Sequence, residues 1–164
     1  MQAWIGLGGN REDSGDLLTQ SLALLAAAPG LSVVRSSRQF RSPAWGVTEQ
    51  PDFVNAVAEL ATELEARTLL EQLLAIERRL GRDRNGERWG PRCIDLDLLT
   101  YEELRMQSAT LTLPHPLMHL RAFVLVPLLE LEPGFVIPGV GPAVDCLQDI
   151  DPQEYATVQP LPTD

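Results

Sequence analysis

The chain has 164 residues, of which 45% are hydrophobic and 22% are charged, as expected for one globular domain. Its formal net charge of −10 argues against binding to nucleic acid or to an anionic membrane. No apolar run approaches the roughly 20 residues that span a bilayer. Cys93 and Cys146 form no CxxC pair, which disfavours a disulfide framework or a structural zinc site and favours a reducing cytoplasm. We therefore expect a single cytoplasmic domain over 1–164, with a loose tail over 153–164.

The first half of the chain alternates strands with helices. Residues 2–7 are typical of a strand that ends in a tight turn at Gly8-Gly9-Asn10. This glycine run does not fit a dinucleotide-binding GxGxxG pattern, because Arg11 stands at the third glycine position. Apolar spacing then predicts a helix over 14–28, a β-like segment over 31–41, a breaker-rich loop over 42–52 and a strand over 53–61.

The next elements complete the expected core. A second amphipathic helix is predicted over 65–80, a basic loop over 82–92 and a strand over 93–100. The order β-α-β-β-α-β predicts an α+β fold with a ferredoxin-like core, an antiparallel sheet, helices packed on it and C-terminal additions. These additions are a strand over 110–113 and a helix over 121–131, which Pro127 is expected to bend or break.

The basic residues are all arginine, and they are unevenly distributed. Six of the thirteen lie between 78 and 92, where only Asp83 and Glu87 oppose them. Because guanidinium forks match phosphate oxygens, this island favours a small polyanion over the plainer interpretation of a solvated loop. The absence of lysine excludes a P-loop and Schiff-base chemistry. The arginines expected to contact phosphate are Arg82, Arg84, Arg88 and Arg92.

Two carboxylates form the strongest motif. Asp95 and Asp97 lie two residues apart in an apolar run, so their side chains leave the same face of the predicted strand. Such acids repel each other and resist burial unless a cation lies between them. Carboxylates without histidine favour Mg²⁺ or Mn²⁺, as one ion or as two ions shared with phosphate oxygens. The alternative interpretation is that both acids lie in solvent on an exposed face of the strand, but the nearby arginines favour a metal site.

Two further groups have both a structural and a functional interpretation. His115 lies between two prolines, which hold it at a fixed angle, so it could donate a hydrogen bond to a phosphate oxygen. Phe53 and Asn55 form another i, i+2 pair, and Phe123 lies far along the chain. Aromatic residues here are more often part of the core, but an aromatic ring beside an amide can also hold a flat heterocycle.

The motifs together resemble a known family. The run from Arg88 to Leu99 is similar to the signature of the 6-hydroxymethyl-7,8-dihydropterin pyrophosphokinases of folate biosynthesis. Shorter matches occur in the same order along nearly the whole chain: Ile5 to Asn10, Arg41-Ser42-Pro43, Gln50 to Asn55, Gly81-Arg82, Pro114-His115-Pro116 and Arg121 to Leu128.

The resemblance implies an ATP- and Mg²⁺-dependent diphosphotransferase. It would transfer the β,γ-diphosphate of ATP to the hydroxymethyl group of the dihydropterin and release AMP, with two Mg²⁺ ions on Asp95 and Asp97. No side chain is an obvious general base, so we expect metal-assisted deprotonation of the pterin hydroxyl. Only small-molecule substrates are implied, with no nucleic-acid or membrane partner, and a monomer is expected.

The resemblance also assigns site residues. Arg82 and Arg92 join the aspartates as catalytic residues. The pterin site would comprise Ser42, Pro43, Trp45, Phe53, Asn55 and Phe123. The ATP site would comprise Leu70, Glu77, Arg82, Arg84, Arg88, Trp89, Arg92, Leu98, Leu111, Thr112, His115 and Arg121. The chain departs from the usual family pattern at Trp45, Phe53, Leu74 and Thr110.

Two other functions remain open on the residues alone. A non-catalytic binding module could use the acids for structural Ca²⁺ and the arginines for a regulatory anion, since a fold of this kind hosts many functions. A nucleotidyl- or glycosyltransferase could use Asp-x-Asp as its metal ligands. The nucleotide product distinguishes them: pterin-dependent AMP supports the pyrophosphokinase, and pyrophosphate supports a nucleotidyltransferase.

Overall fold

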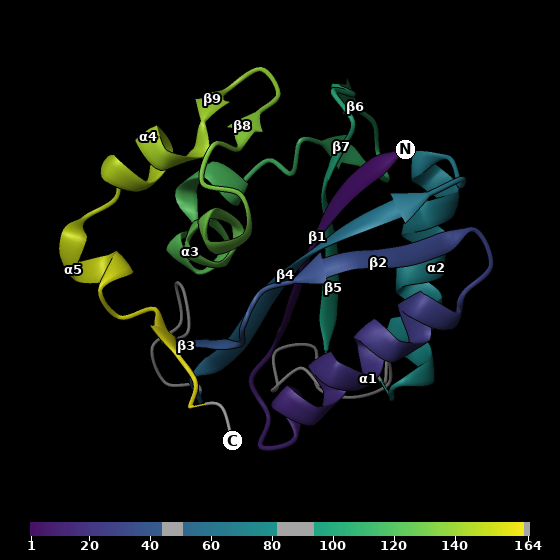
Figure 1. Cartoon of the computed structure of the whole chain (residues 1–164), viewed down its shortest axis with the longest axis horizontal. Coiled ribbons are helices and arrows are strands. Elements are labelled where there is room, and N and C mark those ends of the chain that lie inside the picture. The colour runs from purple at the N-terminus through teal and green to yellow at the C-terminus, as the bar shows by residue number, and fades with distance from the viewer. Residues whose placement is uncertain (44–50, 82–93, 163–164) are drawn as a thin grey trace.

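A six-stranded antiparallel sheet forms the centre of the molecule (Figure 1). The computed structural model describes residues 1–43, 51–81 and 94–162. The main path of the sheet runs in the order β10-β3-β4-β1-β5, and β2 also pairs with β4. The strands are β1 (Gln2–Gly9), β2 (Leu31–Ser36), β3 (Phe40–Ser42), β4 (Phe53–Thr62), β5 (Asp95–Tyr101) and β10 (Gln159–Pro160).

Helices and small hairpins cover this sheet. Figure 1 shows α1 and α2 on one side and α3, α4 and α5 on the other. The helices are α1 (Ser14–Ala27), α2 (Ala66–Arg79), α3 (Ala122–Leu131), α4 (Ala143–Gln148) and α5 (Pro152–Tyr155), with a 3-10 turn η1 at Met118–Leu120. The hairpins pair β6 (Met106–Gln107) with β7 (Thr112–Leu113) and β8 (Val136–Ile137) with β9 (Gly141–Pro142). No described helix combines the length and apolar character needed to cross a membrane.

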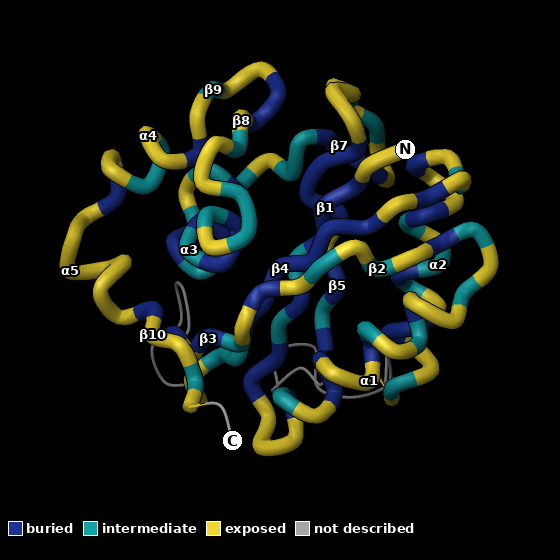
Figure 2. The backbone as a smooth tube through the Cα atoms, viewed as in Figure 1, coloured by how far each residue is buried: buried dark blue, intermediate teal, exposed yellow. Residues whose placement is uncertain are grey.

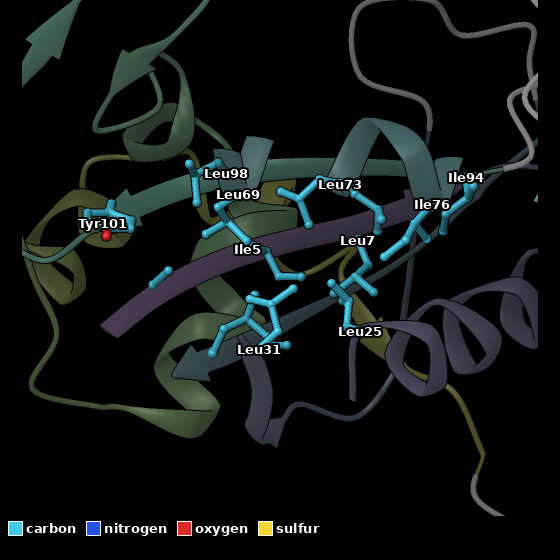
Figure 3. Packing of buried hydrophobic residues seen from close by; sticks show 14 of the residues in the cluster. Ile5, Leu7, Leu25, Leu31, Leu69, Leu73, Ile76, Ile94, Leu98 and Tyr101 are labelled. Carbon is cyan, nitrogen blue, oxygen red and sulfur yellow. The ribbon is translucent and has the colours of Figure 1, made fainter. Parts of the chain in front are cut away.

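Strand alternation sorts the buried side chains into two clusters, one on each face of the sheet. In β1, Ile5 and Leu7 belong to the first cluster, which includes residues of α1 and α2, whereas Trp4 belongs to the second, which includes residues of α3. Figure 3 shows part of the first cluster, and Figure 2 shows that β1 and β4 are largely buried. Each face of the sheet therefore carries a hydrophobic cluster.

The α2 helix forms because its apolar residues share one face. Leu69, Leu73 and Ile76 are spaced at i, i+4 and i+7, and all three are buried in the first cluster. The helix ends at Arg79, and Gly81 follows with a φ of 93°, a left-handed conformation that glycine adopts without a steric cost. This helix places Glu77 beneath the start of β5.

The observed elements confirm the predicted mixture of helices and an antiparallel sheet, but they differ from the prediction at several points. Strand β1 continues through Gly9 instead of turning at Gly8. The predicted segment 31–41 divides into β2 and β3, which pair with different parts of β4. Pro127 lies inside α3 without ending it, and its buried ring belongs to the apolar face of a helix that packs in the second cluster.

The C-terminal tail, expected to be loose over 153–164, has structure up to residue 162. Asp151 caps α5, because its Oδ1 accepts a hydrogen bond from Gln153 N at 2.9 Å. Strand β10 then pairs with β3, and Leu161 N donates to Gln39 O at 2.8 Å. An edge strand has unpaired backbone groups that a tail can satisfy, and tail composition alone does not reveal this pairing.

Arg35 on β2 attaches the end of α3 to the sheet. Its Nε donates to Glu59 Oε2 at 2.6 Å, and one terminal nitrogen donates to Leu131 O at 2.6 Å. The other terminal nitrogen lies 3.0 Å from Glu132 Oε2, and the guanidinium carbon lies 5.5 Å from the centre of the Trp4 ring. The guanidinium thus joins β2, β4 and the C-terminal end of the helix that carries Phe123.

Replacing Leu73 by alanine is expected to destabilise the protein by about 3 kcal/mol, because a fully buried leucine leaves a cavity. The matched control is Val34→Ala on β2, a side chain that is 54% exposed and should cost less than about 1 kcal/mol. Urea unfolding followed by circular dichroism measures both. Equal losses in the two variants would contradict the packing described above.

Glu59→Gln is expected to flatten the acid side of the stability profile. Burial raises the pKa of Glu59, but hydrogen bonds from Gln2 and Arg35 outweigh burial, so the pKa lies below its ordinary value of 4.5. The carboxylate therefore stabilises the fold above that pH, and this contribution is lost as pH falls through the folded pKa. Urea unfolding from about pH 7 to about pH 3 should show a smaller loss for the variant than for the wild type.

The control for this pH series is Glu71→Gln, at an exposed position on α2. Its profile should follow that of the wild type. If Glu59→Gln also kept the full wild-type slope, Glu59 would not be the source of the acid-linked loss.

Candidate active site

The two aspartates lie at the start of β5, on the sheet face that carries the second cluster. Asp95 pairs with Gly8 of β1, and Asp97 pairs with Gly6. Leu96 and Leu98, which alternate with them, are buried in the first cluster on the opposite face. The predicted sharing of one face by the two carboxylates is confirmed. Asp95 is half-buried and Asp97 is exposed, so both can be reached by a ligand.

Glu77 anchors the backbone between these acids. Its Oε1 accepts a hydrogen bond from Leu96 N at 2.7 Å, and the residue is only 2% exposed. Among the described residues β5 is an edge strand of the sheet, so within them this N–H has no strand partner on its outer side. The buried carboxylate of α2 therefore takes the place of a neighbouring strand and fixes the peptide that separates Asp95 from Asp97.

A β-bulge positions His115 beside the same strand. The register of β1 against β5 shifts between Trp4 and Ile5, and Leu99 O accepts a hydrogen bond from His115 N at 2.8 Å. In turn, Leu117 N donates to His115 Nδ1 at 3.1 Å. Because Nδ1 accepts this hydrogen bond, a neutral His115 ring carries its proton on Nε2.

His115, Arg121 and the acid pair interact electrostatically. Burial lowers the pKa of His115, Asp97 acts to raise it, and Arg121 lowers it further. Burial also lowers the pKa of Arg121, while Asp97 and Asp95 act to raise it. Arg121 lies just before α3, and its guanidinium carbon is 5.5 Å from the centre of the Phe123 ring. The fold thus brings together a histidine, an arginine and two aspartates that the sequence separates.

An amide lies on the other side of β1. Gly8 pairs with Asn55 of β4, and Asn55 pairs with Phe40 of β3. Asn55 is 4% exposed, and its Nδ2 donates to Ser42 Oγ at 2.8 Å. Directly opposed residues of antiparallel strands project to the same face, so Asn55 and Asp95 flank Gly8 on one side of the sheet.

The remaining aromatic and apolar candidates fall on both sides of the sheet. Phe53 is half-buried and pairs with Ser42, while Phe123 of α3 packs against the second cluster. Pro43 is exposed just after β3. The predicted adenine-lining leucines Leu70, Leu98 and Leu111 all belong to or pack against the first cluster, and Thr112 is half-buried in β7. Leu98 therefore faces away from the acid pair.

Several predicted residues lie outside the described part of the chain. They are Trp45, Arg82, Arg84, Arg88, Trp89 and Arg92. Within the described ranges, no group of three or more histidine, cysteine, aspartate or glutamate side chains is placed to hold a metal ion. Two reachable carboxylates on one face nevertheless suit Mg²⁺, which is commonly bound by one or two carboxylates together with substrate phosphates and water.

One close contact did not follow from the sequence. A Cβ added to Gly8 would lie 2.8 Å from Asn55 Oδ1. The available signal was a glycine inside an apolar alternating run, which often marks a close approach of other atoms to a strand. Because Gly8 was predicted to lie in a turn, this indication of a close contact within a strand was missed.

Comparisons with known proteins place the chain in a family. Residues 4–133 match the family model described as 7,8-dihydro-6-hydroxymethylpterin-pyrophosphokinase (HPPK). A protein of Methylorubrum extorquens named 2-amino-4-hydroxy-6-hydroxymethyldihydropteridine pyrophosphokinase is 44% identical over 96% of this chain and 99% of its own length. A protein of Synechocystis with the same name is 43% identical over 97% of this chain and 80% of its own.

A solved structure shares the fold. The crystal structure of an HPPK-DHPS in complex with substrates matches with a TM-score of 0.73 at 10% identity. The match covers 90% of this chain but 42% of that one, so this chain spans less than half of the solved protein's length. The family model and the two close relatives each cover well over half of the chain, and the chain belongs to the 7,8-dihydro-6-hydroxymethylpterin-pyrophosphokinase family.

Proposed function

We propose that this protein transfers the β,γ-diphosphate of ATP to the hydroxymethyl group of 6-hydroxymethyl-7,8-dihydropterin, giving AMP and the pterin diphosphate of folate biosynthesis. One observation carries the proposal. On a single sheet face, Gly8 separates an acid suited to a metal, Asp95, from a buried amide, Asn55, suited to a heterocycle. Membership of the pyrophosphokinase family supports the same reaction.

The phosphate end of the site lies at β5. Asp95 and Asp97 would hold two Mg²⁺ ions, which when bound would neutralise phosphate charge and acidify a coordinated hydroxyl. Arg121 would place its guanidinium against phosphate oxygens, and His115 would donate from Nε2, since its Nδ1 already accepts from Leu117 N. Phosphoryl-type transfer requires mainly alignment and charge neutralisation, which these side chains would supply.

The basic loop would complete this end. Arg82 and Arg92 are proposed to stabilise charge on the oxygen that leaves with AMP, and Arg84, Arg88 and Trp89 to bind the nucleotide. All five lie outside the described residues, so their roles rest on the motif and on the preference of guanidinium groups for phosphate.

The pterin end lies across β1. Asn55 would bind the polar edge of the heterocycle, and Phe53 and Phe123 would stack against its faces. Ser42, Pro43 and Trp45 belong to the segment that would bind the remaining edge. The half-buried state of both phenylalanines supports this role, because rings fully enclosed in the core could not stack against a ligand.

The adenine would bind beside β5 and β7. Leu70, Leu98 and Leu111 form its proposed apolar lining, and Thr112 its polar contact. Because β5 is an edge strand, a nucleotide could extend around that edge from the leucines to Asp97 on the other face. Glu77 would then act through the Leu96 peptide, since its carboxylate is buried in that contact.

We also propose that the core is ferredoxin-like, that the chain is one domain and that it acts as a cytoplasmic monomer. The strand order, with β4 and β1 in the middle and helices after β1 and β4, supports the topology. Analytical ultracentrifugation at micromolar concentration would measure the oligomeric state directly.

Asp97→Asn is expected to lower kcat for AMP formation by at least about 10³-fold, because the variant removes a metal ligand without changing the size of the side chain. The assay contains ATP, Mg²⁺ and hydroxymethyldihydropterin, and the nucleotide product is identified by chromatography. Asp149→Asn, at an exposed position far along the chain, is the control and should keep wild-type turnover.

The product identifies the reaction as well. Formation of AMP only when pterin is present supports the proposal. Release of pyrophosphate would indicate a nucleotidyltransferase, and binding of nucleotide without turnover would indicate a non-catalytic module.

His115→Ala is expected to raise KM for ATP about tenfold and to leave KM for the pterin within about twofold, because it removes one hydrogen bond to phosphate. The matched control is His119→Ala in η1, since His119 is the other histidine of the chain. Steady-state kinetics with each substrate varied separates the two constants. An equal rise in both constants for His115→Ala would indicate a general structural defect instead.

A further inference from the structure

Gly8 lies inside a strand, where glycine is normally unfavourable. It stands within β1 and pairs with neighbours on both sides, Asn55 and Asp95. Glycine in a strand costs conformational entropy and provides no side chain for packing. Gly8 is not among the described glycines with a positive φ, so backbone conformation does not require it. Glycine must therefore be needed here because another atom occupies the space that a Cβ would fill.

The side chain of Asn55 occupies that space. A Cβ on Gly8 would lie 2.8 Å from Asn55 Oδ1, closer than van der Waals contact allows. The next nearest atom, Val54 O, would be 3.7 Å away, which is an ordinary separation. Gly6 on the same strand face provides a contrast, because its Cβ would first meet Leu99 Cδ2 at 3.7 Å. Of these two glycines of β1, only Gly8 is sterically restricted, and a single oxygen atom causes the restriction.

The other end of the same amide is fixed by Ser42. Asn55 Nδ2 donates to Ser42 Oγ at 2.8 Å, and both residues are buried. The amide nitrogen donates to Ser42, and the amide oxygen lies over Gly8. These two contacts give the carboxamide one preferred orientation. That orientation places the acceptor oxygen above β1, on the side of Asn55 nearer to Asp95.

We propose that Gly8 is a positioning residue that, together with Ser42, holds the Asn55 carboxamide with its oxygen directed over β1 as an acceptor for an N–H group of the bound heterocycle. The inference rests on the proposed function, because it assumes that Asn55 binds the pterin. It adds a specificity determinant: a ligand edge that carries N–H donors pairs with Oδ1, whereas an edge that carries only acceptors does not.

A methyl group at position 8 should move the amide without breaking the fold. Asn55 Oδ1 is the far end of a side chain, and rotation about its side-chain bonds relieves the contact more readily than a backbone shift. Rotation would also remove the hydrogen bond to Ser42 and redirect the oxygen. Gly8→Ala is therefore expected to act on ligand binding more than on stability.

The experiment compares Gly8→Ala with Gly6→Ala, Asn55→Ala and the double variant Gly8→Ala/Asn55→Ala. Calorimetry measures the Kd of 6-hydroxymethylpterin and, separately, of α,β-methylene-ATP with Mg²⁺. Gly8→Ala should weaken pterin binding about tenfold and leave nucleotide binding within about threefold, as expected for loss of one buried hydrogen bond. Gly6→Ala should stay close to wild type for both ligands. In the Asn55→Ala background, adding Gly8→Ala should change pterin affinity less than about twofold, because the obstructing atom is absent.

A second measurement needs no ligand. The side-chain amide signal of Asn55 in a ¹⁵N–¹H spectrum is assigned by its loss in Asn55→Ala. This signal should shift in Gly8→Ala and in Ser42→Ala, which removes the hydroxyl partner, and should be unchanged in Gly6→Ala. If Gly8→Ala does not fold, Ser42→Ala tests the same orientation from the other end of the amide.

Wild-type pterin affinity together with an unshifted Asn55 signal in Gly8→Ala would overturn the proposal. A loss of pterin affinity equally large with and without Asn55 would also overturn it, because the effect would not act through the amide. If the wild-type protein failed to bind pterin while the amide signal shifted as described, the positioning by Gly8 would be supported and the proposed function would be wrong.

Discussion

The arrangement of this site depends on the pairing of β1 with two neighbours at once. Because β1 pairs with β4 on one side and with β5 on the other, residues far apart in the chain form a row across the sheet: Phe40, Asn55, Gly8 and Asp95. Adjacent strands are about 4.8 Å apart, so the row places the amide and the first acid about 10 Å from each other. A shift of β5 by one residue would turn both aspartates to the opposite face, where Leu96 and Leu98 now lie.

The two faces of the sheet have different roles. The face toward α1 and α2 is occupied by branched apolar side chains such as Leu69 and Leu73, which are fully buried. On the other face, α3 covers only part of the strands, and the polar candidates lie on the remainder. Arg35 connects these roles, because it joins the end of α3 to Glu59 and thereby supports the helix that carries Phe123. The stability of one end of α3 therefore bears on the position of an aromatic ring at the other end.

Local patterns predicted most of the fold, and non-local contacts account for the differences. The i, i+2 spacing of Asp95 and Asp97 predicted their common face, and leucine spacing predicted α2 within one residue at each end. Intrinsic propensity did not predict the continuous α3, because tertiary packing around Pro127 outweighs the missing N–H. The pairing of β10 with β3 and the contact between Gly8 and Asn55 join residues more than 40 positions apart, so no sequence period reveals them. The roles of the site residues themselves remain predictions.

Charge explains why a rigid backbone would matter at the proposed phosphate end of the site. A nucleotide triphosphate and an acid pair repel each other, and the whole chain carries a net charge of −10. Favourable binding therefore requires cations placed between the acids and the phosphates, and their attraction falls with distance. Leu96 N donates to Glu77 and His115 N donates to Leu99 O, so the backbone beside Asp95 and Asp97 is held in place, as the proposed binding of cations would require. The hydrogen bonds made by Leu96 N and His115 N thus fix the backbone beside the two carboxylates, whose mutual repulsion alone would not hold them in place.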